Sequence, residues 1–146
     1  MTKEERCRLA ADCHNKGINC AQSVLLAFRD ITGLSEAQSL AVASGFGGGM
    51  RCGGICGSVS GAIVVLGCRY PAMDAETKKR STVLTREFQR RFSEQFGALN
   101  CKELLAAKGL KGTPIAEELM PDNHCGLMIC SAVELLCDYL NELEKE

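Results

Sequence analysis

Apolar residues recur along most of the chain every three or four positions, which is the spacing of helices that bury one face. The longest stripe, within residues 74–96, consists of Val83, Leu84, Phe88 and Phe92, and most positions between them are polar or charged. No segment shows the sustained alternation of apolar and polar residues that is typical of a half-buried strand. The pattern therefore predicts an all-α fold.

Capping residues and glycines indicate where the helices begin and end. Thr2 with Glu5, and Ser35 with Gln38, have the spacing of capping boxes, in which two side chains satisfy free backbone N–H groups at a helix start. Together with the glycine stops, these signals predict helices over residues 3–16, 20–31, 36–43, 55–69, 74–96, 101–107 and 122–143. Residues 108–121 contain two glycines and two prolines, so we expect a loop there that has room for one helical turn.

The segment 55–69 allows two interpretations. Gly57 and Gly61 lie four residues apart on one helix face, where small residues let another backbone or a cofactor approach closely. The apolar run around Ile63–Val65 could instead form a buried strand. We favour the helix. The expected fold is then a single cysteine-rich domain over 1–146, a compact bundle of five to seven helices in which a Gly/Cys-rich loop leads into a central buried helix.

Charge and composition exclude several classes of partner. The net charge of −1 offers no basic excess to neutralise the phosphates of a nucleic acid. No apolar segment follows Met1 that would indicate a signal peptide, and the apolar run 62–66 is far shorter than the roughly 20 residues that cross a bilayer. We therefore expect a soluble, cytoplasmic protein without nucleic-acid or membrane partners.

Ten cysteines in 146 residues are the most unusual feature of the composition. Structural disulfides are not expected in a reducing compartment, so this number indicates metal binding or redox chemistry. Cysteine is also a common small core residue. Cys7, Cys13, Cys68 and Cys137 lie within apolar helical stripes, and we interpret these four as core residues.

The Gly/Cys-rich segment 46–62 (FGGGMRCGGICGSVSGA) is the strongest local motif. Its glycines can orient backbone N–H groups inward. Cys56 lies at the start of the expected 55–69 helix, where free N–H groups and the helix dipole favour a thiolate. We therefore expect Cys56 to have a depressed pKa and to react with alkylating agents before Cys68 and Cys137. We also expect that Gly57 has no room for a side chain, because a glycine inside a helix costs about 1 kcal/mol relative to alanine.

Three other cysteines also lie at expected helix starts. Cys20 follows Asn19, Cys101 follows Asn100, and Cys125 follows the pair Asp122–Asn123. Together with Cys56, these residues provide four electropositive positions for thiols. We expect their sulfurs to converge in one pocket at one end of the bundle, with Cys52 on its rim.

Several segments together resemble the C_GCAxxG_C_C family of redox-active proteins. The resemblance spans about residues 15–140, and the segments that carry it are 17–24 (GINCAQSV), 46–50 (FGGGM), 56–61 (CGSVSG) and 96–104 (FGALNCKEL). The segment 56–61 resembles the family's CGAxxG signature, with Ser58 in place of the usual alanine. The resemblance implies that Cys20, Cys56 and Cys101 are family cysteines, with Cys125 as the fourth because the stretch 132–136 follows it at the family's spacing. Cys130 is the alternative for that position.

Four convergent thiolates are compatible with three chemistries. They could hold an iron–sulfur cluster, or a zinc ion in a structural site. Two of them could instead form a reversible disulfide. If the site binds a metal, we expect the ligands to be Cys20, Cys56, Cys101 and Cys125, with Cys52 and Cys130 as alternates. Gly57 would then let the cofactor approach. No C-x-x-C motif indicates a thioredoxin-type site.

The leading functional hypothesis is electron transfer or redox sensing through these cysteines, with another protein as redox partner. The alternatives are a reversible dithiol protein and a metal-binding accessory module without turnover, so the sequence leaves open whether the protein is an enzyme. It is also compatible with a homo-oligomer. His124, beside Cys125, could add positive charge or a further ligand, or lie on the surface. His14 is expected only to complement the dipole at the end of the first helix.

Overall fold

The computed structural model describes residues 1–146, and every regular element in it is helical. The elements are α1 (Lys3–Asn15), α2 (Cys20–Leu26), α3 (Arg29–Thr32), α4 (Glu36–Val42), η1 (Gly49–Gly53), α5 (Gly57–Arg69), α6 (Ala75–Phe96), α7 (Cys101–Ala106), α8 (Pro114–Leu119) and α9 (His124–Glu144). The all-α prediction is confirmed, and the strand interpretation of 63–65 is wrong. The ten elements exceed the expected five to seven, for three local reasons.

The first reason is that the predicted helix 20–31 is broken into α2 and α3. Phe28 leaves helical geometry, with φ −126° and ψ 25°, and its ring is completely buried. The Arg6 guanidinium lies 4.7 Å from the centroid of this ring and donates a hydrogen bond of 2.8 Å to the carbonyl of Ala27. A continuous helix would use that carbonyl to bind the N–H of Ile31, which instead bonds Phe28. A contact with α1 therefore ends α2.

The second reason is that η1 occupies the segment expected to be an open loop. Gly48, Gly49, Met50 and Arg51 all have positive φ, between 58° and 61°, so the chain makes a left-handed turn before it reaches α5. Glycine adopts this conformation readily. Met50 and Arg51 do not, and each such residue costs about 1–2 kcal/mol. The surrounding structure therefore holds this turn against its local preference.

The third reason is α8, which lies in the segment expected to be a loop. Pro114 occupies the first helical position, where its fixed φ suits a helix and no N–H is needed. The next N–H, of Ile115, donates to the carboxylate of Glu134 on α9 at 2.9 Å. Pro114, which was expected to interrupt regular structure, therefore begins a helix. Glu134, from a distant part of the chain, supports that helix start.

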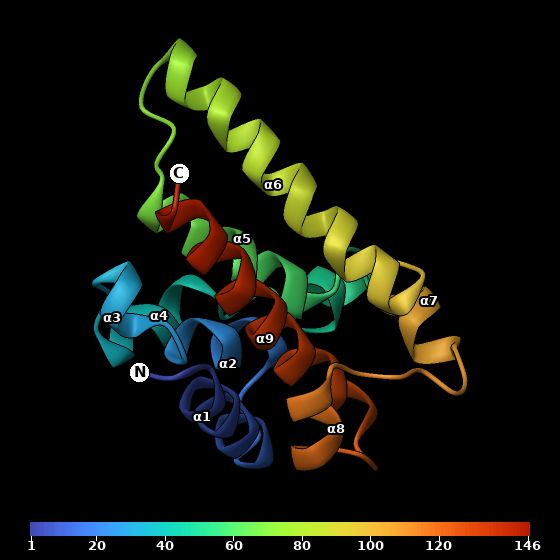
Figure 1. Cartoon of the computed structure of the whole chain (residues 1–146). Helices are drawn as coiled ribbons and strands as arrows, with labels where there is room; N and C mark the ends of the chain where they lie inside the picture. The colour runs from blue at the N-terminus through green and yellow to red at the C-terminus, as the bar shows by residue number, and fades with distance from the viewer.

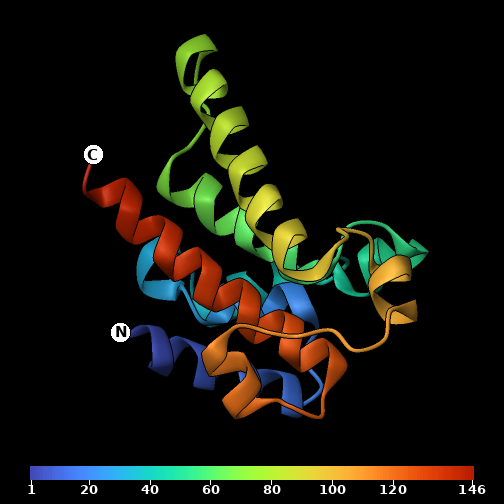
Figure 2. The same ribbon diagram turned by 45° about the vertical axis from the view of Figure 1, so that its right-hand side comes forward.

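The C-terminal helix α9 lies at the centre of the arrangement. In Figures 1 and 2 it runs between α6 on one side and α1 and α8 on the other. Residues 126–134 of α9 are all buried, and most of them are apolar. Packing around α9 therefore joins the beginning, the middle and the end of the chain into one core. None of the helices is long and apolar enough to cross a membrane.

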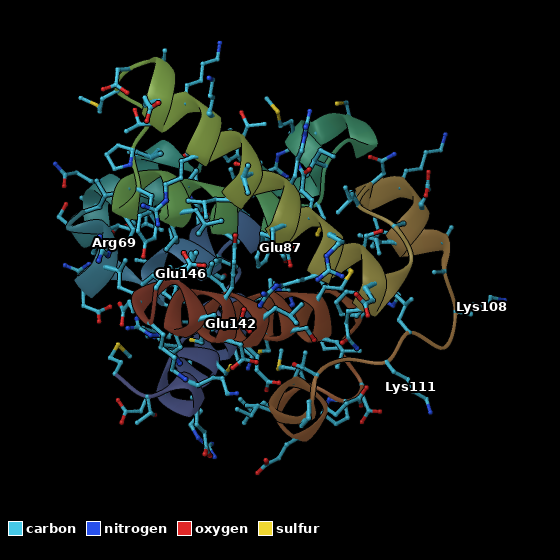
Figure 3. The ribbon with its side chains drawn as sticks, turned by 45° about the horizontal axis from the view of Figure 1, so that its top comes forward. Arg69, Glu87, Lys108, Lys111, Glu142 and Glu146 are labelled. Atoms are coloured by element: carbon cyan, nitrogen blue, oxygen red, sulfur yellow. The ribbon has the colours of Figure 1, made fainter.

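The long helix α6 contacts α9 along part of its length, and its first turns project beyond the rest of the molecule (Figure 1). Its stripe of Leu84, Phe88 and Phe92 is buried as predicted, but Val83 is 64% exposed, so its place in that stripe was wrong. Figure 3 shows Glu87 on α6 and Glu142 on α9. Arg91 forms ion pairs with both carboxylates and joins the two helices at the surface.

Helices α2 and α5 approach each other through small residues. A Cβ on Gly61 would lie 2.8 Å from the carbonyl oxygen of Ala21, and one on Gly57 would lie 3.1 Å from the Ala21 nitrogen. The prediction that Gly57 and Gly61 admit another helix backbone is confirmed. Since Cys20 begins α2 and Cys56 immediately precedes α5, this close packing also brings two cysteines together.

Candidate thiol site

Four cysteines at helix starts form the candidate site. Cys20 and Cys101 are the first residues of α2 and α7, Cys125 is the second residue of α9, and Cys56 is the N-cap of α5. The Cys20 and Cys125 thiols lie close enough for each to shift the pKa of the other, and Cys20 is also influenced by the charge of Cys56 and Cys101. The four residues singled out from the sequence therefore lie near one another, and we call them the site thiols.

A short backbone bridge places Cys56 beside Cys101. The N–H of Cys56 donates to the carbonyl of Leu99 at 2.8 Å, and the N–H of Cys101 donates to the carbonyl of Gly54 at 2.6 Å. These two antiparallel bonds join the segment before α5 to the segment before α7. The glycines at 53 and 54 allow the turn that this pairing requires, with φ of 71° at Gly53.

Gly57 places Cys20 beside Cys56. A Cβ built on Gly57 would lie 3.0 Å from the Cβ of Cys20 and 3.1 Å from the carbonyl oxygen of Phe46. These contacts are tighter than side chains normally accept, so the expectation that Gly57 has no spare room is confirmed. What approaches Gly57 is the α2 backbone together with Cys20 itself.

Two histidines position the start of α9, which carries Cys125. Nε2 of His124 donates a hydrogen bond of 2.6 Å to the carbonyl of Leu104 in α7, since a carbonyl can only accept. Nε2 of His14, at the end of α1, donates to Oδ1 of Asn123 at 3.1 Å; that oxygen also accepts the N–H of Gly126 as the helix cap. Both imidazoles are half-buried near Cys125, so His124 is not the free surface residue considered from the sequence.

The role of His14 could not be found from the sequence. It was expected only to complement a helix dipole, and 109 positions separate it from Asn123. No local motif links two such distant residues. Packing of α1 against α9 brings them together.

The paired thiols of Cys20 and Cys125 have opposite pKa shifts. The neighbouring Cys20 thiol, together with the nearby imidazoles of His14 and His124, lowers the pKa of Cys125 to about 6. The neighbouring Cys125 sulfur and burial raise the pKa of Cys20 above its ordinary range. Cys20 therefore keeps its proton, and Cys125 is the thiol that ionises. A protonated and an ionised sulfur in contact are the two states that disulfide exchange requires.

The prediction of a depressed pKa for Cys56 is wrong. The side chain is 3% exposed, and burial raises the pKa of its thiol even though the N–H groups of Ser58 and Val59 and the Ser58 hydroxyl favour the thiolate. Burial raises the pKa of Cys101 as well. The most acidic site thiol is therefore Cys125, because it combines a helix start with partial exposure, a thiol donor and two imidazoles.

The sulfurs of the two alternate residues face backbone carbonyls. Cys130 is fully buried, and its sulfur faces the carbonyl of Cys7 at 3.6 Å while the sulfur of Cys7 faces the carbonyl of Cys130 at 3.7 Å. Cys52 is exposed and its sulfur faces the carbonyl of Gly49. It also lines an apolar hollow of about 400 Å³ that no other cysteine lines.

Most of the cysteines interpreted as core residues are buried. Cys7, Cys13 and Cys137 are buried as expected, but Cys68 is exposed near the end of α5, so its interpretation as a core residue was wrong. Burial raises the pKa of Cys137 to about 11 and that of Cys130 to about 12. We call Cys7, Cys130 and Cys137 the core thiols, because all three lie where α1 packs against α9.

The side chains near the site do not form a preorganised metal site. No group of three or more histidine, cysteine, aspartate or glutamate side chains has an arrangement that would hold a metal ion. Four-coordinate zinc and iron–sulfur clusters both take four such ligands. A metal bound by the site thiols would therefore require their side chains to reorient.

The chain matches the model of one protein family. That family is described as "Putative redox-active protein (C_GCAxxG_C_C)", and the match covers residues 18–139. The matched region contains all four site thiols and excludes the whole of α1, which carries His14. The chain has no significant match among curated proteins or among solved structures.

Proposed function

The chain belongs to the C_GCAxxG_C_C family, and from this membership and the geometry of its thiols we propose that it is a thiol–disulfide redox protein in which Cys20 and Cys125 are the exchanging pair. The observation that carries the proposal is the close approach of these two thiols at the starts of α2 and α9, where Cys20 keeps its proton and Cys125 readily loses it. A low-pKa thiolate with a second thiol in contact is the arrangement that exchanges electrons with a disulfide.

The exchange has two steps. The Cys125 thiolate attacks one sulfur of a partner's disulfide, the partner's S–S bond breaks, and one partner sulfur leaves as a thiolate while the other forms a mixed disulfide with Cys125. Cys20 then gives its proton to solvent and attacks Cys125, forming the Cys20–Cys125 bond and releasing the second partner thiolate. The pair loses two electrons and the proton of Cys20, and the partner's disulfide becomes two thiolates, which take up protons from solvent. The reverse sequence reduces the pair.

Exposure supports the assignment of Cys125 as the attacking thiol. Cys125 and Cys20 are half-buried, so a partner sulfur can approach them, whereas Cys56 is almost completely covered. Cys101 is also half-buried, but burial raises the pKa of its thiol and no imidazole offsets that effect. Cys125 is therefore the site thiol that is both accessible to a partner protein and readily ionised.

The proposal is tested by mapping disulfides in the full-length protein. The reduced chain is mixed with reduced and oxidised glutathione, quenched with acid at successive times, alkylated and digested, and the linked peptides are identified by mass spectrometry. We expect a reversible two-electron oxidation whose first bond joins Cys20 to Cys125. Cys125→Ser and Cys20→Ser should each abolish it, while Cys68→Ser, which removes an exposed thiol far from the pair, should leave it unchanged. Oxidation that links other cysteines first would contradict the proposal.

A metal–sulfur centre is the second candidate, because four thiols at four helix starts lie near one another. This is the ligand number of an iron–sulfur cluster, which would transfer electrons, and of structural zinc, which would indicate an accessory module. Anaerobic purification followed by iron, sulfide and zinc analysis distinguishes these outcomes. The variant Cys101→Ser distinguishes either metal centre from the dithiol function. A four-thiolate centre would lose its metal in this variant, whereas the Cys20–Cys125 exchange should persist.

A further inference from the structure

Ser58 carries a buried hydroxyl that lacks a fully formed hydrogen bond. The residue is completely covered, and its Oγ is the one buried side-chain oxygen or nitrogen in the chain without a hydrogen-bond partner. A buried hydroxyl in this condition is destabilising, and each such group in a native structure calls for an explanation, of which a redox or catalytic role is one. Ser58 is also the motif position where alanine is usual, so a helix at this place does not need the hydroxyl.

The Ser58 hydroxyl lies near the sulfur of Cys56 but forms no hydrogen bond with it. Cys56 precedes α5, and the N–H of Ser58 lies near the same sulfur, while the N–H of Val59 donates to the Cys56 carbonyl at 2.9 Å. A neutral thiol sulfur is a weak acceptor, which explains why the hydroxyl forms no bond in this state. A thiolate is a strong acceptor, and hydrogen bonds to charged atoms are about twice as strong as neutral ones. The N–H and the hydroxyl of Ser58 therefore suit a negatively charged Cys56.

Cys56 can exchange only with its neighbours inside the protein. At 3% exposure it is closed to a partner protein, while Cys20 is close enough to be influenced by its charge. Cys20 is the shared neighbour, since it contacts Cys125 on one side and lies against Gly57, the residue after Cys56, on the other. A buried thiol supplied with donors for its anion, next to one member of an exchanging pair, is suited to attack that member.

We infer that a disulfide formed at the surface passes inward from Cys20–Cys125 to Cys20–Cys56, and that Ser58 is the positioning residue that stabilises the attacking Cys56 sulfur. This step rests on the proposed dithiol function. Cys56 gives its proton to water and attacks the sulfur of Cys20, the Cys20–Cys125 bond breaks, and Cys125 leaves as a thiolate. One S–S bond replaces another, so no electrons are gained or lost. The oxidised state is then buried, and Cys125 is free again at the surface.

The transfer is followed in a Cys101→Ser background, which removes the fourth site thiol as a competing partner. The reduced protein receives one equivalent of oxidised glutathione and is quenched with acid at successive times, and its disulfides are mapped by mass spectrometry. We expect Cys20–Cys125 to appear first and Cys20–Cys56 to replace it. Absence of any Cys20–Cys125 bond would overturn the proposed function. Formation of that bond with Cys56 free at all times would overturn only the inward transfer.

Ser58→Ala tests the hydroxyl, with Ser60→Ala as the matched control on the same helix. The Ser60 hydroxyl donates to the carbonyl of Cys56 at 3.2 Å and does not serve the sulfur. Loss of one hydrogen bond to a charged sulfur lowers the thiolate population by about tenfold or more. The greater nucleophilicity of the less stabilised thiolate offsets about half of this on a logarithmic scale, so we expect the second step to slow about threefold. The same transfer rate in both variants and the parent would overturn the role of Ser58.

Ser58→Ala should fold, because it removes an unsatisfied buried group and introduces the residue usual in the motif. Its thermal midpoint should be at least that of the parent. A slower second step in a variant of undiminished stability is a result that a purely structural role of Ser58 would not produce.

Discussion

Helix α9 carries three cysteines whose chemistry differs according to their position along it. At its start, the pKa of Cys125 is lowered to about 6, whereas farther along burial raises the pKa of Cys130 to about 12 and that of Cys137 to about 11. Residue type and helix are the same in all three cases. The first turn of a helix leaves N–H groups free and admits polar neighbours, while its interior uses every N–H and here faces apolar side chains.

The site thiols and the core thiols differ in the same way across the whole molecule. Each site thiol lies at a helix start, where chain segments meet and polar groups gather. The core thiols lie in helix interiors, and the sulfurs of Cys7 and Cys130 each face the backbone carbonyl of the other residue. Such contacts suit a neutral S–H group. The number of cysteines therefore says less about chemistry than their positions relative to helix ends.

The largest expected effect is the difference in reactivity between Cys125 and Cys130. At pH 7 a thiol of pKa about 6 is mostly ionised, while one of pKa about 12 has about one thiolate in 100,000. The higher nucleophilicity of the more basic thiolate offsets part of this, which leaves at least about a hundredfold difference before burial is considered. A time course of iodoacetamide labelling read by mass spectrometry measures it, with exposed Cys68 as the reference for access. Equal labelling of Cys125 and Cys130 in the folded protein would refute the comparison.

The next effect tests the packing that holds the site thiols together. Gly61→Ala places a methyl group 2.8 Å from the carbonyl oxygen of Ala21, and we expect a loss of about 1–3 kcal/mol in the free energy of unfolding. Gly67→Ala is the matched control in the same helix, since nothing lies within 4 Å of its added Cβ. It should stabilise the protein by about 0.5–1 kcal/mol. Urea unfolding of both variants measures the contrast, and a change of the same sign in both would show that α2 and α5 are not held at contact distance.

The third effect is the pH dependence of stability, in which the two groups have opposite signs. The folded pKa of Cys125 lies below the ordinary value near 8.5, so its contribution is complete above that value and is lost as the pH falls through about 6. Cys130 has a raised folded pKa, so stability falls above pH 8.5 as the unfolded chain ionises and the folded one does not. Each such thiol contributes a slope of at most about 1.4 kcal/mol per pH unit.

Two substitutions separate these contributions. Cys130→Ala should reduce the alkaline slope of unfolding free energy between pH 9 and 11, whatever its effect on stability at neutral pH. Cys125→Ala should remove the rise between pH 6 and 8.5 and leave most of the alkaline slope. Urea unfolding over this pH range measures both. An alkaline slope unchanged by Cys130→Ala would mean that its thiol is accessible to water.

The sequence predicted the helix starts well, because capping is a local interaction. Asn19 and Ser35 cap their helices as expected, and the cysteines at helix starts follow from the same signals. What it did not predict depends on partners far along the chain. Arg6 breaks the helix at Ala27, Glu134 supports the start of α8, and His14 reaches Asn123. The pKa of Cys56 was misjudged for a similar reason, since the free N–H groups at a helix start can be inferred from sequence but the burial of that start cannot.

The two backbone hydrogen bonds between residues 54–56 and 99–101 mean that this part of the thiol site can open only as one unit. The amide protons of Cys56 and Cys101 both form hydrogen bonds in this bridge, so neither can exchange with solvent until the two segments separate. Separation would release α7 and uncover the buried sulfur of Cys56 in one event. Hydrogen exchange at these two amides should therefore proceed at one common rate, and that rate sets the upper limit for any external reagent that reaches Cys56.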